Sequence, residues 1–159
     1  MAPSHELDAR RAMALRARDL LEGGYHCSEA VLLAVGPVLV RDWDPAFLRL
    51  ANGFAGGLGG SQAEVCGALA GGVMVIGALF GREQLQDDTL AQRLSRQFRE
   101  RFHDAFGETQ CAPLRNNVVK SEGGLGSCAV VVERATMILL TVLAEAGVRL
   151  PTAASDPAP

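Results

Sequence analysis

The stretch SQAEVCGALAGGVMVIGALFG, residues 61–81, decides the fold because it joins a helix signal to an unusual density of glycine. Ser61 and Glu64 have the spacing of a capping box, in which each side chain satisfies a backbone N–H group of the first helical turn. The run from Val65 to Gly81 contains no charged residue. We therefore expect a central helix over about 62–80, buried on all sides by other helices.

Four glycines lie within this predicted helix, and each costs about 1 kcal/mol relative to alanine. They are Gly67, Gly71, Gly72 and Gly77. Gly67 and Gly71 are four residues apart and share one helix face. Without side chains on that face, another backbone or a bound group can approach closely. Because Cys66 directly precedes this face, tight helix packing and a binding site beside the thiol are both compatible with the pattern.

The rest of the sequence predicts an all-α fold, because we find no alternating strand pattern. We expect a bundle of five to six helices, with Pro37 ending or kinking the second, and a stripe of Leu90, Leu94, Phe98, Phe102 and Phe106 facing the core. The 159 residues suit one domain; we expect it over 1–150, with a disordered tail over 151–159. The expected helices are 6–22, one that begins near 26, 45–54, 62–80, 88–106 and 128–146, with an additional short helix over 110–116.

Composition and charge exclude several classes of function. The formal net charge of −3 lacks the electrostatic footprint of a nucleic-acid-binding protein. The N-terminal segment carries arginines and no apolar core of the kind that secretory signals have. The uncharged run 65–81 is at the lower limit of membrane-spanning length, and we interpret it as a buried helix and expect no membrane span. These features favour a reducing cytoplasm, where cysteines are more often metal-binding, catalytic or inert than disulfide-bonded.

The four cysteines share a position relative to the predicted helices. Cys27, Cys66, Cys111 and Cys128 each fall within about the first turn of a different predicted segment. Helix N-termini carry partial positive charge and unpaired N–H groups, which stabilise a thiolate and lower the pKa of a cysteine. There is no CxxC pair, so the fold would have to gather these thiols. Alternatively, all four are small buried residues of the core.

The order of the cysteines, together with CGALAG at 66–71, resembles the C_GCAxxG_C_C family of small proteins named as candidate redox-active proteins. The other matching segments are YHCSEAVLLA, ETQCAPL and GSCAVVVERA, and the resemblance covers about 8–146. This chain departs from the family at His26, where asparagine is expected. The resemblance implies redox activity. The domain is also similar to part of the split-Soret cytochromes, which are associated with an iron–sulfur cluster; the haem-attachment motif CxxCH is absent here.

Two redox hypotheses follow from these observations. Cys27, Cys66, Cys111 and Cys128 could bind an iron–sulfur cluster, with Gly67 and Gly71 giving close approach. Alternatively, two thiols form a reversible disulfide, with Cys66 and Cys27 as the candidate catalytic thiols and Cys66 as the attacking one. The pairing stays open, since four cysteines allow three pairings. The partner would be a redox protein or a small thiol.

Three further interpretations stay open. Four cysteines suit a structural zinc ion, although the usual short ligand spacing is missing. The chain could instead be a helical interaction module with core cysteines and no cofactor. A cysteine nucleophile assisted by His26 is also compatible with the sequence, although it leaves three cysteines unexplained. A homodimer is plausible under every hypothesis.

Overall fold

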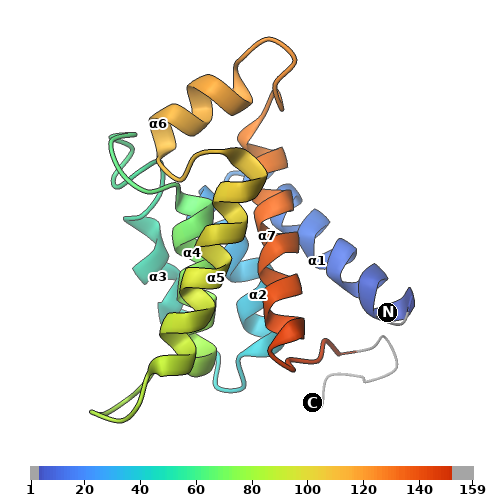
Figure 1. Ribbon diagram of the computed structural model, residues 1–159, viewed down its shortest axis with the longest axis vertical. Coiled ribbons are helices and arrows are strands. Elements are labelled where there is room, and N and C mark those ends of the chain that lie inside the picture. Colours follow the sequence, from blue (N-terminus) through green and yellow to red (C-terminus); the bar gives the residue numbers. More distant parts are fainter. Residues whose placement is uncertain (1–3, 152–159) are drawn as a thin grey trace.

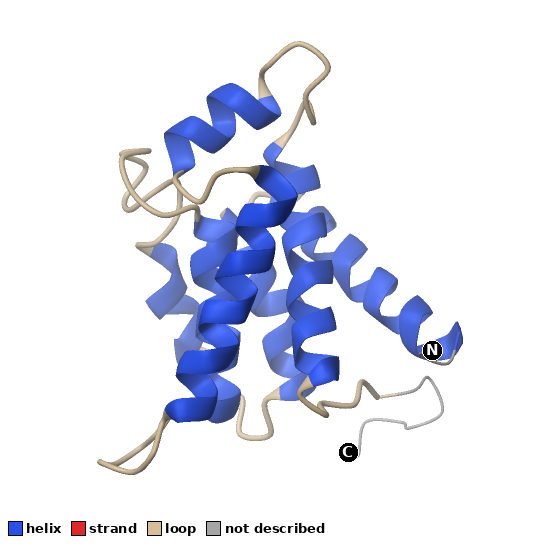
Figure 2. Ribbon diagram, viewed as in Figure 1, coloured by secondary structure: helices blue, strands red, loops and turns tan. Residues whose placement is uncertain are grey.

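The computed structural model describes residues 4–151, which are helical and contain no β-strand, so the predicted all-α fold class is confirmed (Figure 2). The predicted tail over 151–159 lies, apart from Pro151, outside the described residues. The helices are α1 (Ser4–Glu22), α2 (Cys27–Leu39), α3 (Ala46–Asn52), α4 (Gly67–Phe80), α5 (Thr89–Phe106), α6 (Cys111–Pro113), the π-helix η1 (Leu114–Val119) and α7 (Cys128–Glu145).

The described part of the chain has seven α-helices and one π-helix, where five to six helices were expected. The difference concerns short elements. The segment predicted over 110–116 forms one α-helical turn, α6, which passes directly into η1. None of the described helices is both long enough and apolar enough to cross a lipid bilayer.

Four helices, α2, α4, α5 and α7, lie along the long axis of the molecule, and α1 packs obliquely on α7 and α2 (Figure 1). The core between them holds large apolar side chains with almost no exposed surface, among them Leu32, Ile76, Phe98, Phe102 and Leu139. α2, α4 and α7 begin at the same end of this bundle, where α6 and η1 lie across it (Figure 1). The N-termini of these three helices therefore lie together at one end of the molecule.

The prediction that the glycine-rich helix starts near 62 is wrong, because α4 begins at Gly67. Ser61 makes no capping box with Glu64; its hydroxyl accepts a hydrogen bond from the Ala63 N–H at 3.2 Å instead. Only the first half of α4 is buried on all sides, since Val73 and Gly77 are exposed. The segment before α4 is extended because its backbone groups pair with another segment rather than with the helix.

The glycines of α4 allow close helix packing. A side chain on Gly71 would place its Cβ 2.5 Å from the carbonyl oxygen of Ser28, at the start of α2. A side chain on Gly67 would collide with the sulfur of Cys27, and one on Gly72 with the ring of Phe98 on α5. The glycine-rich face is therefore occupied by the backbone of α2 and by a cysteine sulfur.

Two smaller expectations also need correction. Leu90 is 41% exposed and does not extend the buried stripe of α5, because the first turn of that helix reaches beyond the core; Ala91 is buried there instead. Leu94, Phe98, Phe102 and Phe106 are buried as predicted. Of the two effects expected of Pro37, ending the helix at that residue is wrong, since α2 continues to Leu39, and a kink stays a prediction.

Substituting two glycines of α4 tests this packing. We expect Gly71→Ala to destabilise the protein by about 1–3 kcal/mol, the usual range for overpacking a close contact. Gly77→Ala is the matched control, since an added Cβ there has no neighbour within 4 Å. It should stabilise the protein by up to about 1 kcal/mol through helix propensity. Urea unfolding of both variants measures this difference, and equal effects would contradict the packing described.

Candidate functional site

Cys27 is the first residue of α2, and a buried carboxylate fixes the start of that helix. The Glu29 side chain, 8% exposed, accepts hydrogen bonds from the His26 backbone N–H at 2.9 Å and from the Asn52 side-chain amide at 2.8 Å. Burial raises the pKa of Glu29, but these hydrogen bonds outweigh it and hold the pKa below its usual range. His26 is the N-cap residue of α2, and it is exposed.

Cys66 and Cys111 are brought together by a short pairing of extended backbone. The Cys66 N–H donates to the Thr109 carbonyl at 2.8 Å, and the Cys111 N–H donates to the Glu64 carbonyl at 2.8 Å. This antiparallel bridge, recorded between Val65 and Gln110, replaces the first helical turn that the sequence predicted. Cys66 consequently is the N-cap of α4, and Cys111 is the first residue of α6.

A left-handed turn over residues 56–60 precedes this pairing. All five residues have φ between 57° and 74°, including Leu58, at 67°. L-residues adopt this conformation at a cost of about 1–2 kcal/mol, except glycine. The Gln62 N–H closes the turn by donating to the Gly56 carbonyl at 2.8 Å. The turn presses Gly57 against Cys111, because a side chain on Gly57 would place its Cβ 2.7 Å from the Cβ of Cys111.

Cys128 is the first residue of α7, as the sequence predicted. The hydroxyl of Ser127 caps this helix by accepting a hydrogen bond from the Ala129 N–H at 3.0 Å. Cys128 and Cys27 are half-buried, whereas Cys66 and Cys111 are each only 6% exposed. All four cysteines are free thiols.

One cavity of about 180 Å³ is lined by all four cysteines. Its other walls are mainly apolar and come from α1, the 56–60 turn, α4, η1 and α7. They include Gly67, which shares α4 with the predicted Gly71; Gly71 packs on Ser28 and does not line the cavity. The structure therefore brings the four predicted cysteines and one of the two predicted glycines to one site.

Burial, rather than helix position, controls the acidity of the most buried thiol. It raises the pKa of Cys66 to about 12, and repulsion from the thiolates of Cys27 and Cys111 adds to the rise. The backbone N–H groups of Ala68 and Leu69, in the first turn of α4, lower the pKa of Cys66, but by less than burial raises it. The sequence predicted a lowered pKa from the same N–H groups, and that expectation is wrong for Cys66.

The same balance holds at two other cysteines. Burial raises the pKa of Cys111 and of Cys128 above the ordinary value for a thiol. The positive charge of Arg115 lowers both values but does not reverse the shift. Repulsion from Cys27 raises both, which is further evidence that these sulfurs are neighbours. Without a bound cation, these two thiols and that of Cys66 favour their protonated form.

The described residues contain no group of three or more histidine, cysteine or acidic side chains arranged around one point as a single metal ion requires. Tetrahedral zinc needs four ligands within about 2.3 Å of the metal. The cysteines instead line the wall of a cavity. This arrangement suits a larger bound group, or pairs of thiols, better than one ion.

Sequence reasoning missed Arg115, the charged side chain in the cavity wall. It follows Cys111 by four residues, and this spacing on a helix would have been enough to suggest it. Reasoning from the sequence also missed Gly57, because nothing in AGGLGG indicates which glycine meets a cysteine. The hydrogen bond between Glu29 and Asn52 was missed as well, because it joins residues that are 23 positions apart in the chain.

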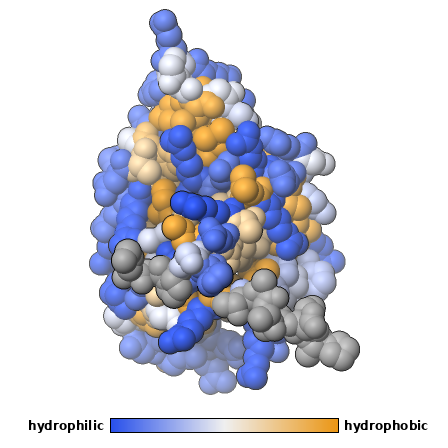
Figure 3. Space-filling view, turned by 90° about the vertical axis from the view of Figure 1, so that its right-hand side faces the viewer, coloured by the Kyte–Doolittle hydropathy of each residue, from blue (hydrophilic) through white to orange (hydrophobic). Residues whose placement is uncertain are grey.

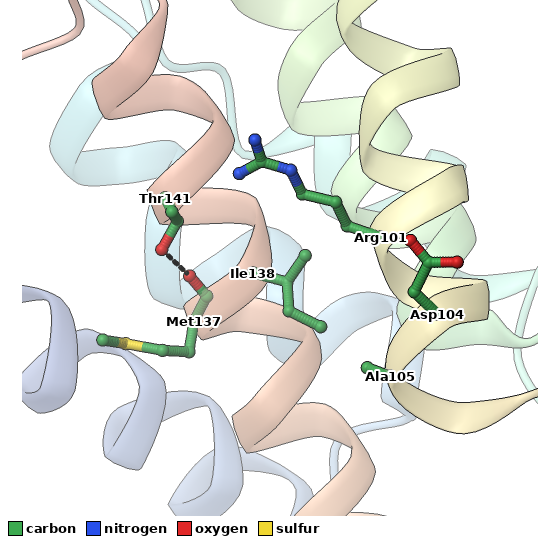
Figure 4. Close-up of a pocket in the computed structure, with 6 residues that line it drawn as sticks. All are labelled: Arg101, Asp104, Ala105, Met137, Ile138 and Thr141. Carbon is green, nitrogen blue, oxygen red and sulfur yellow. Dashed lines mark hydrogen bonds between the residues drawn. The ribbon is translucent and has the colours of Figure 1, made fainter.

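A second, wider hollow of about 400 Å³ lies between α5 and α7, and it holds no cysteine (Figure 4). Arg101 extends across its mouth to Glu145, with 2.6 Å between the charged atoms. Thr141 turns away and donates its hydroxyl proton to the Met137 carbonyl at 2.9 Å (Figure 4). The face turned toward the viewer in Figure 3 is mostly hydrophilic, with an apolar area toward the end where the cysteine helices begin. We therefore assign the candidate site to the cysteine cavity.

Comparison with protein families gives one match. Residues 25–142, which include all four cysteines, match the family model described as "putative redox-active protein (C_GCAxxG_C_C)". No curated protein and no solved structure matches the chain.

The raised pKa of Cys66 predicts how stability depends on pH in the metal-free protein. Its folded pKa of about 12 exceeds the unfolded value of about 8.5, so the folded state holds this proton more tightly. The resulting stability is complete below about pH 8.5 and is lost as the pH rises toward 12. The difference in unfolding free energy between wild type and Cys66→Ala should therefore shrink from pH 8 to pH 11. A constant difference would contradict this assignment.

Proposed function

This chain belongs to the C_GCAxxG_C_C family, and we propose that its four-cysteine cavity is a redox centre that binds an iron–sulfur cluster for electron transfer. The observation that supports this proposal is the shared cavity of Cys27, Cys66, Cys111 and Cys128. Both [2Fe–2S] and [4Fe–4S] clusters take four cysteine thiolates. The donor set is therefore of the right kind and number.

The chemistry of the thiols also favours a metal-containing group. Cysteines that act as nucleophiles have lowered pKa values, whereas the pKa of Cys66 is about 12. A coordinated thiol is deprotonated outright, because the metal places much more positive charge at the sulfur than the single cation Arg115 in the cavity wall can. When bound, a cluster would supply one-electron transfer.

The chain's own residues would hold such a group in three ways. The cysteines are the ligands, and their positions at helix starts are fixed by backbone pairing and by Glu29. Gly67 leaves room for the sulfur of Cys27. Leu114, Val131 and Val132 would give the bound group an apolar wall.

Anaerobic reconstitution with iron and sulfide tests the proposal. We expect the wild-type protein to become coloured, with bound iron and few titratable thiols. Cys66→Ser should lose most of the iron and the absorbance, because a buried ligand is removed. Gly77→Ala is the matched control, since it lies on the same helix, away from the cavity, and keeps all four ligands. Circular dichroism confirms that each variant is folded.

The competing outcomes are distinct. Zinc without visible absorbance would favour the structural zinc interpretation. Colourless, metal-free protein with four free thiols after reconstitution would overturn the cluster proposal. Unchanged iron content in Cys66→Ser would contradict the role of that residue.

Reversible thiol–disulfide exchange is a second candidate function, favoured by the half-buried Cys27, which lines the same cavity as the buried Cys66. In this version two thiols lose two electrons and two protons to an oxidised partner protein or a small disulfide. The accessible Cys27 is then better suited than Cys66 to meet the partner. The resolving thiol stays open among the other three.

Mild oxidation with diamide tests this second function. If it is correct, thiols should disappear in pairs, and Cys27→Ser should slow the first step strongly because the accessible thiol is gone. The matched control is Cys128→Ser, which removes the other half-buried thiol. Thiol counts by Ellman titration, with peptide mapping of the bonds formed, provide the measurement. Loss of single thiols to mixed products, without intramolecular bonds, would contradict this function.

A further inference from the structure

The wall of the cysteine cavity has a simple charge pattern. Among the residues that line it, Arg115 is the one with a permanently charged side chain, and no aspartate or glutamate accompanies it. His26 is the other ionisable wall residue besides the cysteines. A single cation facing an apolar cavity without a counter-ion makes negative charge favourable there.

The surroundings of Arg115 support this view. It is half-buried in η1, and within residues 4–151 it forms no ion pair and no side-chain hydrogen bond. π-Helical segments are rare and frequently lie at functional sites. Lys120, directly after η1, adds a second positive charge that acts on Cys128. Since the whole chain carries a net charge of −3, this positive potential is local.

We propose that Arg115 is a positioning residue that makes the cysteine cavity selective for negative charge, so that its small-molecule reactants are anionic rather than cationic thiol compounds. The proposal deepens the redox function proposed above and rests on the same cavity. The same charge would also offset the negative charge of a bound cluster and its thiolates. Arg115 acts through its electrostatic field on the cavity, whose wall it shares with Cys111 and Cys128.

Charged thiol reagents test this selectivity on the reduced, metal-free protein. We would use two methanethiosulfonates of similar size, one bearing a sulfonate and one a trimethylammonium group. In each reaction the cysteine thiolate attacks the reagent, a mixed disulfide forms and methanesulfinate leaves. Mass spectrometry of peptides gives the rate at Cys128, the half-buried thiol on which Arg115 acts. The measured quantity is the ratio of the anionic to the cationic rate.

At low ionic strength, we expect Arg115→Gln to lower this ratio at least about threefold, because one nearby charge changes the two rates in opposite directions. Arg115→Lys keeps the charge and should retain most of the ratio. Arg99→Gln is the matched control, since it removes the same charge from an exposed position on α5, which does not line the cavity. A ratio in Arg115→Gln equal to that in Arg99→Gln would overturn the proposal.

The salt dependence of the wild-type ratio is a second measurement that needs no variant. If Arg115 dominates, raising the salt from about 0.02 M to 1 M lowers the ratio by screening. If the net charge of the chain dominates, the ratio rises with salt, and the proposal is wrong. Iron loading tests the cluster separately. Charge selectivity without iron binding would overturn the cluster alone, and iron binding without selectivity would overturn the role of Arg115 alone.

Discussion

The close contact between the first turns of α2 and α4 is the constraint on which the rest of the site depends. Gly71 faces the Ser28 carbonyl, and Gly67 faces the sulfur of Cys27, so neither position has space for a side chain. The hydroxyl of Ser28 is itself occupied, donating to the Ala51 carbonyl at 2.7 Å and tying α3 to the same place. Because these backbones meet, two cysteines from helices far apart in sequence stand at one cavity.

Two physical effects with opposite signs act on the sulfur atoms of this site. Helix N-termini stabilise negative charge, whereas an apolar cavity destabilises it. At Cys66 burial is stronger, and its thiol stays protonated. An isolated helix N-terminus would instead activate its cysteine. The arrangement therefore keeps the thiols of Cys66, Cys111 and Cys128 protonated until a metal-containing group enters the cavity, which suits ligands better than nucleophiles.

The fold class, most helix positions and the helix-start location of the cysteines could be predicted from the sequence, because they follow from local periodicity and capping. The start of α4 could not, because its first expected turn pairs with residues 109–112 and forms no helix. That pairing is non-local, and Ser61 and Glu64 fit a capping box that the tertiary structure overrides. The raised pKa of Cys66 was missed for a related reason, since its burial depends on segments that are distant in the sequence. That Arg115 is charged could be predicted from the sequence, but that its side chain lines the cysteine cavity could not.

The left-handed turn at Gly56–Gly60 has a consequence for how this protein can vary. Over these five residues every backbone φ is positive, opposite in sign to the φ of an ordinary helix. The chirality of a residue, rather than its size or polarity, therefore decides whether it is tolerated there. A D-residue would adopt this positive φ without strain, whereas an L-residue is strained. Leu58 shows that the turn can bear one strained side chain. At Gly57, where Cys111 also closes the space, the chain has no such freedom, so the close approach of this turn to one cavity cysteine depends on the one achiral amino acid.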